Sequence, residues 1–292
     1  MQSKIFYRDI FTRCEKIPLN YEVAEKLCED AFLLCRSDGD LYQKKIDNLL
    51  AMDVEFLKLQ ASLEKNGRYL YSTFEEVERE VFKKKKTDNE YGVDYLWGLY
   101  FSQVFWTTHH RVLNFLLKEF IYTSGTNGRF LDAPVGSGVF STQFLLANPL
   151  WRGVGVDLSK TAIDLAEGFL KINGLEDRIE LVQDNFFTFT SEDPFDRIMC
   201  IEFIEHVEDP LAVLRKLRTL LSDRGEIFLM TVAWAAHIDH IYLYRNADEI
   251  RDHIRQSGLQ IEKEYVQNIF DKDNGKLQDS KVALNYAAIL TK

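Results

Sequence analysis

Apolar residues recur every three or four positions through the first 122 residues, which is the spacing of helices that bury one face. After Asn20, a residue type that often caps helices, this spacing runs to residue 37. It resumes at residue 41 and ends at Gly67, a residue type suited to the backbone turn that closes a helix. These stretches predict an all-α region over residues 1–122, which we expect to cover a binding site or to dimerise.

Two more helices are predicted within this region. Ser72 and Thr73 are each followed three residues later by a glutamate, so a helix is expected to begin there with a capping box. The segment 94–122 keeps the helical spacing, carries many aromatic residues, and predicts one long helix. The polar, glycine-containing loop 123–128 then marks the boundary between two domains.

After this loop, short apolar runs alternate with helical stretches. Strands are expected at 129–133, 152–157, 179–183, 196–202, 225–233, 259–268 and 284–291, with helices near 138–148, 160–173, 209–221 and 247–257. The first five strands alternate with helices, which is the pattern of a doubly wound parallel sheet. The last two are joined by a segment with the turn signal Asn274-Gly275, so the final strand should run antiparallel. The prediction is an α/β fold with a seven-stranded sheet over 123–292 and an N-terminal all-α domain.

Four acidic residues follow the strands of this sheet. Asp132, Asp157, Asp184 and Glu202 stand at or just after the ends of the first four strands. Ligands of such sheets bind at this edge, where the carboxyl ends of the strands meet. Acids repel the phosphates of a dinucleotide, which prefer N–H groups and cations. The ligand should therefore carry hydroxyls and positive charge.

The glycine loop at 132–138 is also incomplete as a dinucleotide motif, because Ser141 stands in the third glycine place. At this point the sequence resembles the class I S-adenosylmethionine-dependent methyltransferases, over roughly residues 125–292. The segments that carry the resemblance are DAPVGSG (132–138), GVGVDLS (153–159), VQDNFFTF (182–189) and FDRIMCIEFIEHVEDP (195–210). Pro134 replaces the first glycine of the first motif.

The resemblance implies a Rossmann-like methyltransferase sheet, S-adenosylmethionine as cofactor and S-adenosylhomocysteine as product. Asp157 would hold the ribose hydroxyls and Asp184 the adenine amine, with Asn185 and Phe186 beside the ring. The residues expected at the cofactor are Asp132, Ala133, Pro134, Gly136, Gly138, Asp157, Leu158, Asp184, Asn185, Phe186 and Glu202. A dinucleotide such as NAD is the alternative ligand that the acids disfavour.

Histidines near this edge are candidates for the catalytic base. His206 closes the string E-x-x-E-H after the fourth strand, and His240 follows the fifth, so both are predicted to be catalytic. His237 is a lesser candidate, whereas His253 lies within a helix and is expected to be structural. A similar string holds a metal in certain RNA 3′-end methyltransferases. Glu202, Glu205 and His206 with a later histidine are therefore an alternative site for a divalent ion, although the main prediction includes no metal.

The aromatic segment before the boundary bears on the substrate. Most of its rings are expected in the core, and some, with Tyr100, are expected to roof a substrate pocket. His109 and His110 reach that pocket only if their helix covers it. We expect methylation of oxygen or nitrogen on a small metabolite or natural product. The alternatives are a methyltransferase acting on a peptide or RNA end, or a module that binds S-adenosylmethionine or NAD without catalysis.

Charge and cysteine content narrow the partners. The net charge of −10 argues against a DNA partner, because nonspecific binding needs clustered positive charge. The four cysteines form no C-x-x-C pair, which argues against a zinc site and predicts reduced thiols in the cytoplasm. With no signal peptide and no apolar run of membrane-spanning length, we expect no membrane partner. The expected partners are a small-molecule substrate and a second copy, docked through the N-terminal helices.

Overall fold

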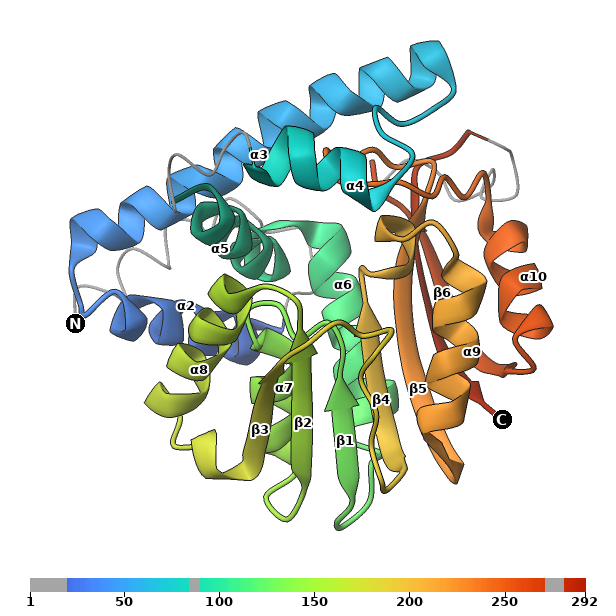
Figure 1. Ribbon diagram of the computed structural model, residues 1–292. Coiled ribbons are helices and arrows are strands. Elements are labelled where there is room, and N and C mark those ends of the chain that lie inside the picture. Colours follow the sequence, from blue (N-terminus) through green and yellow to red (C-terminus); the bar gives the residue numbers. More distant parts are fainter. Residues whose placement is uncertain (1–19, 84–89, 271–280) are drawn as a thin grey trace.

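The computed structural model describes residues 20–83, 90–270 and 281–292 (Figure 1). Its seven strands are β1 (Arg129–Asp132), β2 (Arg152–Asp157), β3 (Ile179–Gln183), β4 (Phe195–Ile201), β5 (Leu221–Ala233), β6 (Gln260–Asn268) and β7 (Leu284–Thr291). They form one sheet in the order β3-β2-β1-β4-β5-β7-β6. The first five strands are parallel, and β7 is antiparallel to both β5 and β6, which confirms the predicted sheet. The predicted turn at Asn274-Gly275 lies outside the described residues.

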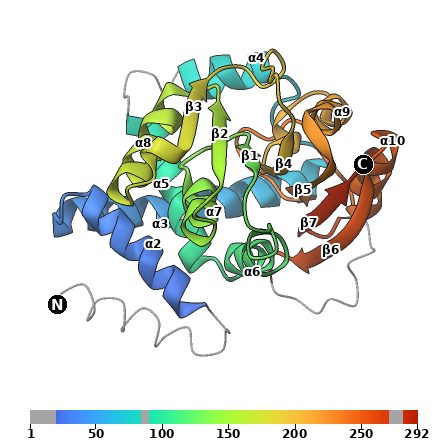
Figure 2. The same ribbon diagram turned by 90° about the horizontal axis from the view of Figure 1, so that it is seen from below.

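Helices cover both faces of the sheet, as Figure 2 shows from below. The alternation of strand side chains decides which residues meet which helices. In β4, Met199 and Ile201 join the cluster that contains α7 (Val139–Ala147) and the end of α8 (Lys160–Ile172). Ile198 and Cys200 point to the other face and join the cluster of α9 (Pro210–Leu220) and α10 (Ala247–Gln256). Both faces of the strand are therefore buried, as expected for a doubly wound sheet.

The N-terminal region lies across the carboxyl-terminal edge of the sheet and beside α7 and α8 (Figure 1). Its elements are α2 (Tyr21–Leu34), α3 (Gly39–Asn66), α4 (Phe74–Val77), the π-helical turn Glu78–Lys83, α5 (Glu90–Phe105), α6 (Thr107–Leu116) and the π-helical turn Leu117–Ile121. Short 3₁₀ turns occupy Glu176–Arg178 and Ile204–His206. None of the helices in the described ranges is both long and apolar enough to cross a membrane.

Local sequence signals fix the ends of these helices. The side chain of Asn20 accepts from the backbone N–H of Val23, as predicted for a cap. Gly67 closes α3 with a φ of 69°. Of the two overlapping capping boxes, Thr73 supplies the cap of α4, while the carboxylate of Glu76 accepts from the backbone of Ser72.

The prediction of one long helix over 94–122 is wrong. The chain leaves helical geometry at Trp106, with φ −86° and ψ 113°, so α5 and α6 are separate. The free carbonyl of Gln103 near the end of α5 accepts from Nδ1–H of His110 at 2.9 Å. The other ring nitrogen of His110 accepts from the backbone N–H of Asn20 at 3.0 Å. This buried histidine therefore stabilises the break and joins three segments, which periodicity alone does not reveal.

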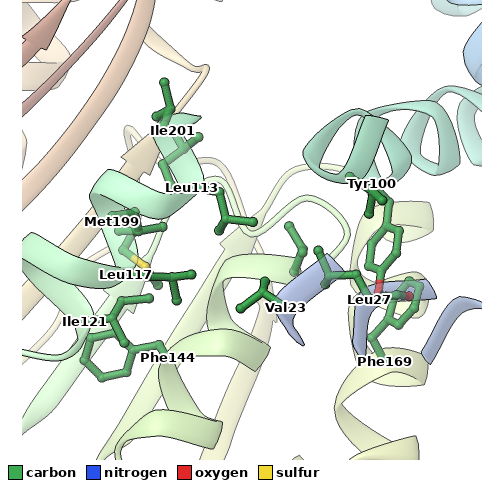
Figure 3. Close-up of a cluster of buried hydrophobic side chains, with 14 of the residues drawn as sticks. Val23, Leu27, Tyr100, Leu113, Leu117, Ile121, Phe144, Phe169, Met199 and Ile201 are labelled. Carbon is green, nitrogen blue, oxygen red and sulfur yellow. The ribbon is translucent and has the colours of Figure 1, made fainter. Parts of the chain in front are cut away.

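Buried side chains from both sides of residue 123 belong to one hydrophobic cluster (Figure 3). Tyr100 of α5 stacks on Phe169 of α8 with ring centroids 4.2 Å apart, and its hydroxyl donates to the carbonyl of Leu27. Leu117 and Phe144 belong to the same cluster. The N-terminal helices therefore pack directly on the sheet region, and the division at residue 123 into two domains stays a prediction.

Candidate active site

A cavity of about 540 Å³ lies between the N-terminal helices and the carboxyl ends of β4 and β5. Apolar and aromatic side chains of α3, α5 and the α5–α6 break form one part of its wall, among them Phe56, Phe105 and Trp106. Polar side chains from the segments after β4 and β5 form the other part, among them His206 and His240. The cavity thus joins an aromatic wall to a cluster of titratable groups, as is typical of sites for small molecules.

The N-terminal helices hold the loop that follows β5. The side-chain amide of Gln60 on α3 donates to the carbonyl of Trp234 and accepts from the N–H of Ala236. The hydroxyl of Tyr69 donates to the carbonyl of Ala235 at 2.7 Å. The same carbonyl accepts from Nδ1–H of His240 at 2.9 Å, which fixes the ring. Residues distant in sequence thereby set the orientation of a cavity side chain.

Three histidines converge around Asp239 in this loop. Nδ1 of His237 donates to the Asp239 carboxylate at 2.6 Å, and Nδ1 of His206 donates to its backbone carbonyl at 3.2 Å. The Nδ1 atom of His206 also lies 3.5 Å from the Asp239 carboxylate. The rings of His206 and His240 are 4.9 Å apart between centroids. The structure therefore brings together the two predicted catalytic histidines and His237.

The charges of this cluster shift the pKa values of its members in opposite directions. Burial lowers the pKa of His206, but the carboxylates of Asp239, Glu205 and Glu202 outweigh burial and raise it above its usual value. Burial dominates at His240 and, with the neighbouring histidines, holds its pKa well below the usual value. Burial would raise the pKa of Asp239, yet the histidines around it lower this pKa. His240 is thus the neutral ring and His206 the more basic one.

Glu205 adds a buried carboxyl group behind these rings. One of its oxygens accepts from the hydroxyl of Thr231 at 2.8 Å, and the other has no partner among the described residues. Burial raises the pKa of Glu205 to about 7. The ligand atoms of Glu205, His206 and His240 lie within 4.8 Å of one another, as do those of His237, Asp239 and His240. Either group has side chains of the types that bind divalent ions.

Glu202, expected at the cofactor, lines this cavity. It follows β4 with a φ of 49°, which is uncommon for a residue other than glycine. Trp234, which follows β5, has a φ of 50°. The Glu202 carboxylate lies 3.6 Å from Nε2 of His109, and burial raises its pKa. Strained backbone at the ends of two neighbouring strands is a common mark of a functional site.

The first glycine loop lies at the end of β1. Asp132 is fully buried; one oxygen accepts from Ser141 at 2.6 Å, and the other has no partner among the described residues. Burial raises the pKa of Asp132 to about 8. Gly136 has a φ of 52° and open space where a Cβ would stand, so a ligand can approach its backbone. Gly138 has a φ of 75° and packs against Ala166, where a Cβ would lie 2.8 Å from the alanine methyl. Ala133 and Pro134, joined by a cis peptide bond, lie between Asp132 and these glycines.

Asp157 connects β2 to this loop. One carboxylate oxygen accepts from the N–H of Gly136 at 3.0 Å, and the other accepts from Ser159 at 2.9 Å. Burial raises its pKa, which these hydrogen bonds oppose. The neighbouring Leu158 is 53% exposed, so an apolar side chain stands at the rim beside the carboxylate. Asp157 therefore combines a half-buried position with an anchored geometry.

The carboxylate of Asp184, which follows β3, forms its hydrogen bonds with residues close to it in the sequence. The carboxylate of Asp184 accepts from the N–H of Asn185 at 2.7 Å and from the hydroxyl of Thr188. The side chain of Asn185 accepts from the N–H of Phe187. Phe186 is buried against Phe203, with ring centroids 5.4 Å apart. Their role at adenine stays a prediction, since the contacts that the structure shows build the turn itself.

The aromatic segment divides between the core and the cavity. Phe105 and Trp106 line the cavity, and so does His109, because the break between α5 and α6 turns them toward it. The expectation that Tyr100 roofs the pocket is wrong, since it is buried against Phe169. Two acids were not predicted from the sequence: Asp53 on α3, which lines the cavity, and Asp239, which holds His206 and His237. The spacing H-x-D-H at 237–240 was the one available signal for the latter.

A family model for the methyltransferase domain matches residues 102–264, more than half of the chain. The chain belongs to this family, and it is a class I S-adenosylmethionine-dependent methyltransferase. The match begins within α5, so the family region includes the break at Trp106 and all of α6. This finding confirms the resemblance that the four sequence segments suggested.

Curated relatives include the ubiquinone biosynthesis O-methyltransferases. The protein of Haemophilus ducreyi is 31% identical over 130 residues, which cover 41% of this chain and 53% of the relative. That of Xanthomonas campestris is 35% identical over 111 residues, covering 36% of this chain and 43% of the relative. The chain thus spans about half the length of the curated relatives that it matches.

Solved structures share the fold. An O-methyltransferase from neocarzinostatin biosynthesis, in complex with S-adenosylmethionine and a hydroxynaphthoic acid, aligns with a TM-score of 0.53 and 16% identity. The alignment covers 82% of this chain and 69% of that chain. The cyclase SpnF aligns with a TM-score of 0.52 and 14% identity, over 64% of this chain and 83% of that chain. At these identities the comparison supports the fold.

The residues at the sheet edge fit the chemistry of S-adenosylmethionine, the cofactor of this family. Its sulfonium, ammonium and ribose hydroxyls match carboxylate acceptors, and the edge offers Asp132, Asp157 and Glu202. Asp132 has a buried oxygen without a partner among the described residues. Gly136 leaves open space at its backbone. These observations support Asp157 as the ribose residue and the loop at 132–138 as the cofactor loop.

Replacing Asp157 with alanine is expected to weaken S-adenosylhomocysteine binding by about 1.5–3 kcal/mol, the scale of a charge-assisted hydrogen bond. Isothermal calorimetry measures the change, with Asp164→Ala on the exposed side of α8 as the control that leaves affinity unaltered. Thermal melting shows whether the loop that Asp157 anchors stays folded. Unchanged affinity in Asp157→Ala, or tighter binding of NAD than of S-adenosylhomocysteine, contradicts the assignment.

Proposed function

We propose that this chain methylates a hydroxyl group on a planar aromatic small molecule. The observation that carries the proposal is the cavity itself, in which aromatic side chains face a cluster of histidines beside the cofactor edge. Its volume of about 540 Å³ is in the range of sites for small molecules. The names of the curated relatives, O-methyltransferases of ubiquinone biosynthesis, support oxygen as the acceptor atom.

The aromatic wall orients the acceptor. Phe56 and Trp106 lie with ring centroids 6.3 Å apart, and Phe56 lies 5.9 Å from Phe270. Flat rings bind between such side chains through offset stacking and edge contacts. This geometry favours a planar acceptor such as an aromatic natural product, and it disfavours a flexible peptide end. Bound S-adenosylmethionine supplies an electrophilic methyl group on its sulfonium.

His206 is the proposed general base. Its Nδ1–H donates to the Asp239 carbonyl, so its Nε2 is the free acceptor atom that takes the proton of the substrate hydroxyl. The nearby Asp239 carboxylate stabilises the imidazolium that results. His240 stays neutral and offers its own Nε2 as an acceptor that orients the hydroxyl, because Nδ1–H is held by Ala235.

A direct assay tests the proposal. The purified chain is incubated with S-adenosylmethionine and 4-propylcatechol, a neutral planar acceptor with two adjacent hydroxyls, and mass spectrometry follows the product. We expect a gain of one methyl group on oxygen and formation of S-adenosylhomocysteine. A chain that binds the cofactor but methylates none of a panel of phenols, catechols and hydroxyquinones contradicts the proposal. If the chain methylates a peptide or RNA end and none of these small molecules, the acceptor is a macromolecule and the proposed acceptor class is wrong.

The same assay settles whether a metal participates. The alternative site at Glu205, His206 and His240 is tested by adding EDTA to the wild-type chain. We expect turnover to persist, because the proposed base needs no ion. Loss of turnover that Mg²⁺, Mn²⁺ or Fe²⁺ restores would assign the cluster to a metal.

A further inference from the structure

We infer that Asp53 binds a protonated nitrogen on the acceptor, so that the preferred substrate is an aromatic hydroxyl compound that carries an amine. Asp53 lies on α3 and lines the cavity. The inference rests on the proposed function, because it assigns a specificity residue to that same cavity. The aromatic wall does not determine whether the acceptor is charged, and the inference adds that the acceptor carries a positive charge.

The position of Asp53 departs from the pattern of its helix. The inward side of α3 carries Leu49, Met52 and Leu63 as buried residues, with Phe56 in the cavity wall. A carboxylate on such a face costs free energy unless something compensates its charge. Residues that break the local pattern in this way mark functional sites.

The partners that the structure gives Asp53 leave its charge uncompensated. Burial raises the pKa of Asp53, and the neighbouring Trp106 side chain opposes this shift by a smaller amount. Within the described residues, Asp53 has no ion-pair partner. Of the described residues that line the cavity, none is lysine or arginine, whereas Asp53 and Glu202 are acids. Among the described lining residues, therefore, no lysine or arginine compensates the Asp53 carboxylate, and a substrate could supply that cation.

The surroundings favour an ammonium group over a neutral donor. Trp106 lies close enough to Asp53 to influence its pKa, and Phe56 lies beside Trp106. Aromatic faces next to a carboxylate attract cations, because the ring quadrupole and the carboxylate act together. A protonated amine also gains a charge-assisted hydrogen bond, which is about twice as strong as a neutral one.

Trp106 places this anchor relative to the reacting end of the cavity. Its ring packs edge-on against His109 with centroids 4.8 Å apart, and His109 lies 3.6 Å from Glu202. The cavity wall thus extends from Asp53 along the rings of Trp106 and His109 to the carboxylate of Glu202, which follows β4. An acceptor held at Asp53 by its amine can extend along this wall toward His206, which lines the same cavity.

Calorimetry with three catechols tests the inference in the presence of S-adenosylhomocysteine. Dopamine carries an ammonium, 4-propylcatechol is its neutral counterpart, and 3-(3,4-dihydroxyphenyl)propanoate carries a carboxylate. We expect the wild-type chain to bind dopamine at least about tenfold more tightly than 4-propylcatechol, and the carboxylate compound most weakly. In Asp53→Asn, dopamine and 4-propylcatechol should bind equally.

The asparagine variant separates charge from structure, because it keeps the size of the side chain and one acceptor oxygen. Asp47→Asn removes a charge from the exposed side of the same helix and should keep the tenfold preference. Equal binding of dopamine and 4-propylcatechol by the wild-type chain overturns the inference, as does a preference that survives in Asp53→Asn. Methylation of 4-propylcatechol reports on the proposed function separately, since that compound has no amine.

Discussion

Alanine at position 206 is expected to lower kcat by about 10²–10⁴-fold, which is the usual contribution of a general base. The imidazole of His206 accepts the substrate proton and is held by Asp239, and alanine supplies neither function. Affinity for S-adenosylhomocysteine should stay nearly unchanged, because the residues expected at the ribose and the adenine, Asp157 and Asp184, follow other strands of the sheet edge. Steady-state kinetics with 4-propylcatechol and calorimetry with S-adenosylhomocysteine measure the two effects.

A matched control separates the base from structural histidines. His253 on α10 is hydrogen-bonded to the hydroxyl of Tyr244 and does not line the cavity, so His253→Ala should retain kcat near the wild-type value. His240→Ala should also lower turnover if its ring orients the hydroxyl. Near-normal turnover in both His206→Ala and His240→Ala across pH 6 to 8 would show that neither histidine is needed as a base.

The pH profile gives a second readout of the same assignment. Since the surrounding carboxylates raise the pKa of His206, the acid limb of kcat/KM should lie above pH 6.5, the usual value for histidine. Protonation of the base below that pKa removes its acceptor, so activity falls as the pH falls. Asp239→Asn removes one of these charges and should move the acid limb to lower pH. A limb that does not move means that Asp239 does not set the basicity of the catalytic group.

Phe101→Ala is expected to cost about 3–5 kcal/mol of unfolding free energy, the scale for removing a fully buried phenylalanine. Phe101 is 0% exposed and packs among Tyr42, Trp97 and Tyr100, with ring centroids 5.7–5.8 Å away. Its removal leaves a cavity between α3 and α5, within the cluster that also contains side chains of the sheet region. Chemical denaturation monitored by circular dichroism measures the loss.

The control for this change is Phe187→Ala, because Phe187 is 46% exposed. It should cost about 1 kcal/mol or less, as is usual at the surface. A similar small loss in Phe101→Ala would show that the N-terminal helices do not depend on this cluster. Separate unfolding transitions in the wild-type chain would support the predicted division at residue 123.

The sequence determined the sheet and the cofactor edge because both depend on local patterns. All seven strands appear where apolar runs predicted them, and helices separate β1 from β2, β2 from β3, and β4 from β5. Asp132, Asp157 and Glu202 stand at or just after the ends of their strands. Because these strands are parallel, their ends share one edge of the sheet, and the acids meet there. Likewise, the caps at Asn20 and Thr73 depend on contacts within three residues.

Only the tertiary structure decided how the N-terminal helices meet the site. The break at Trp106 is bridged by His110, which bonds to the end of α5 and to Asn20 at the start of α2, 90 positions away in the sequence. That break turns Trp106 and His109 into the cavity while Tyr100 stays in the core. A helical period is unchanged by such a break and therefore could not predict it.

The same reason applies to the acids that the sequence analysis missed. In the sequence, Asp53 is indistinguishable from the other charged residues of an amphipathic helix. It lines the cavity because α3 crosses the sheet edge (Figure 1). Asp239 lies in the loop after β5, which Gln60 of α3 holds in place. This loop brings Asp239 beside His206, which follows β4, so that Asp239 can orient the histidine. Sequence spacing fixes which residues share a strand or a helix face. Contacts between elements far apart in the chain are set by packing, and they decided which side chains meet in this site.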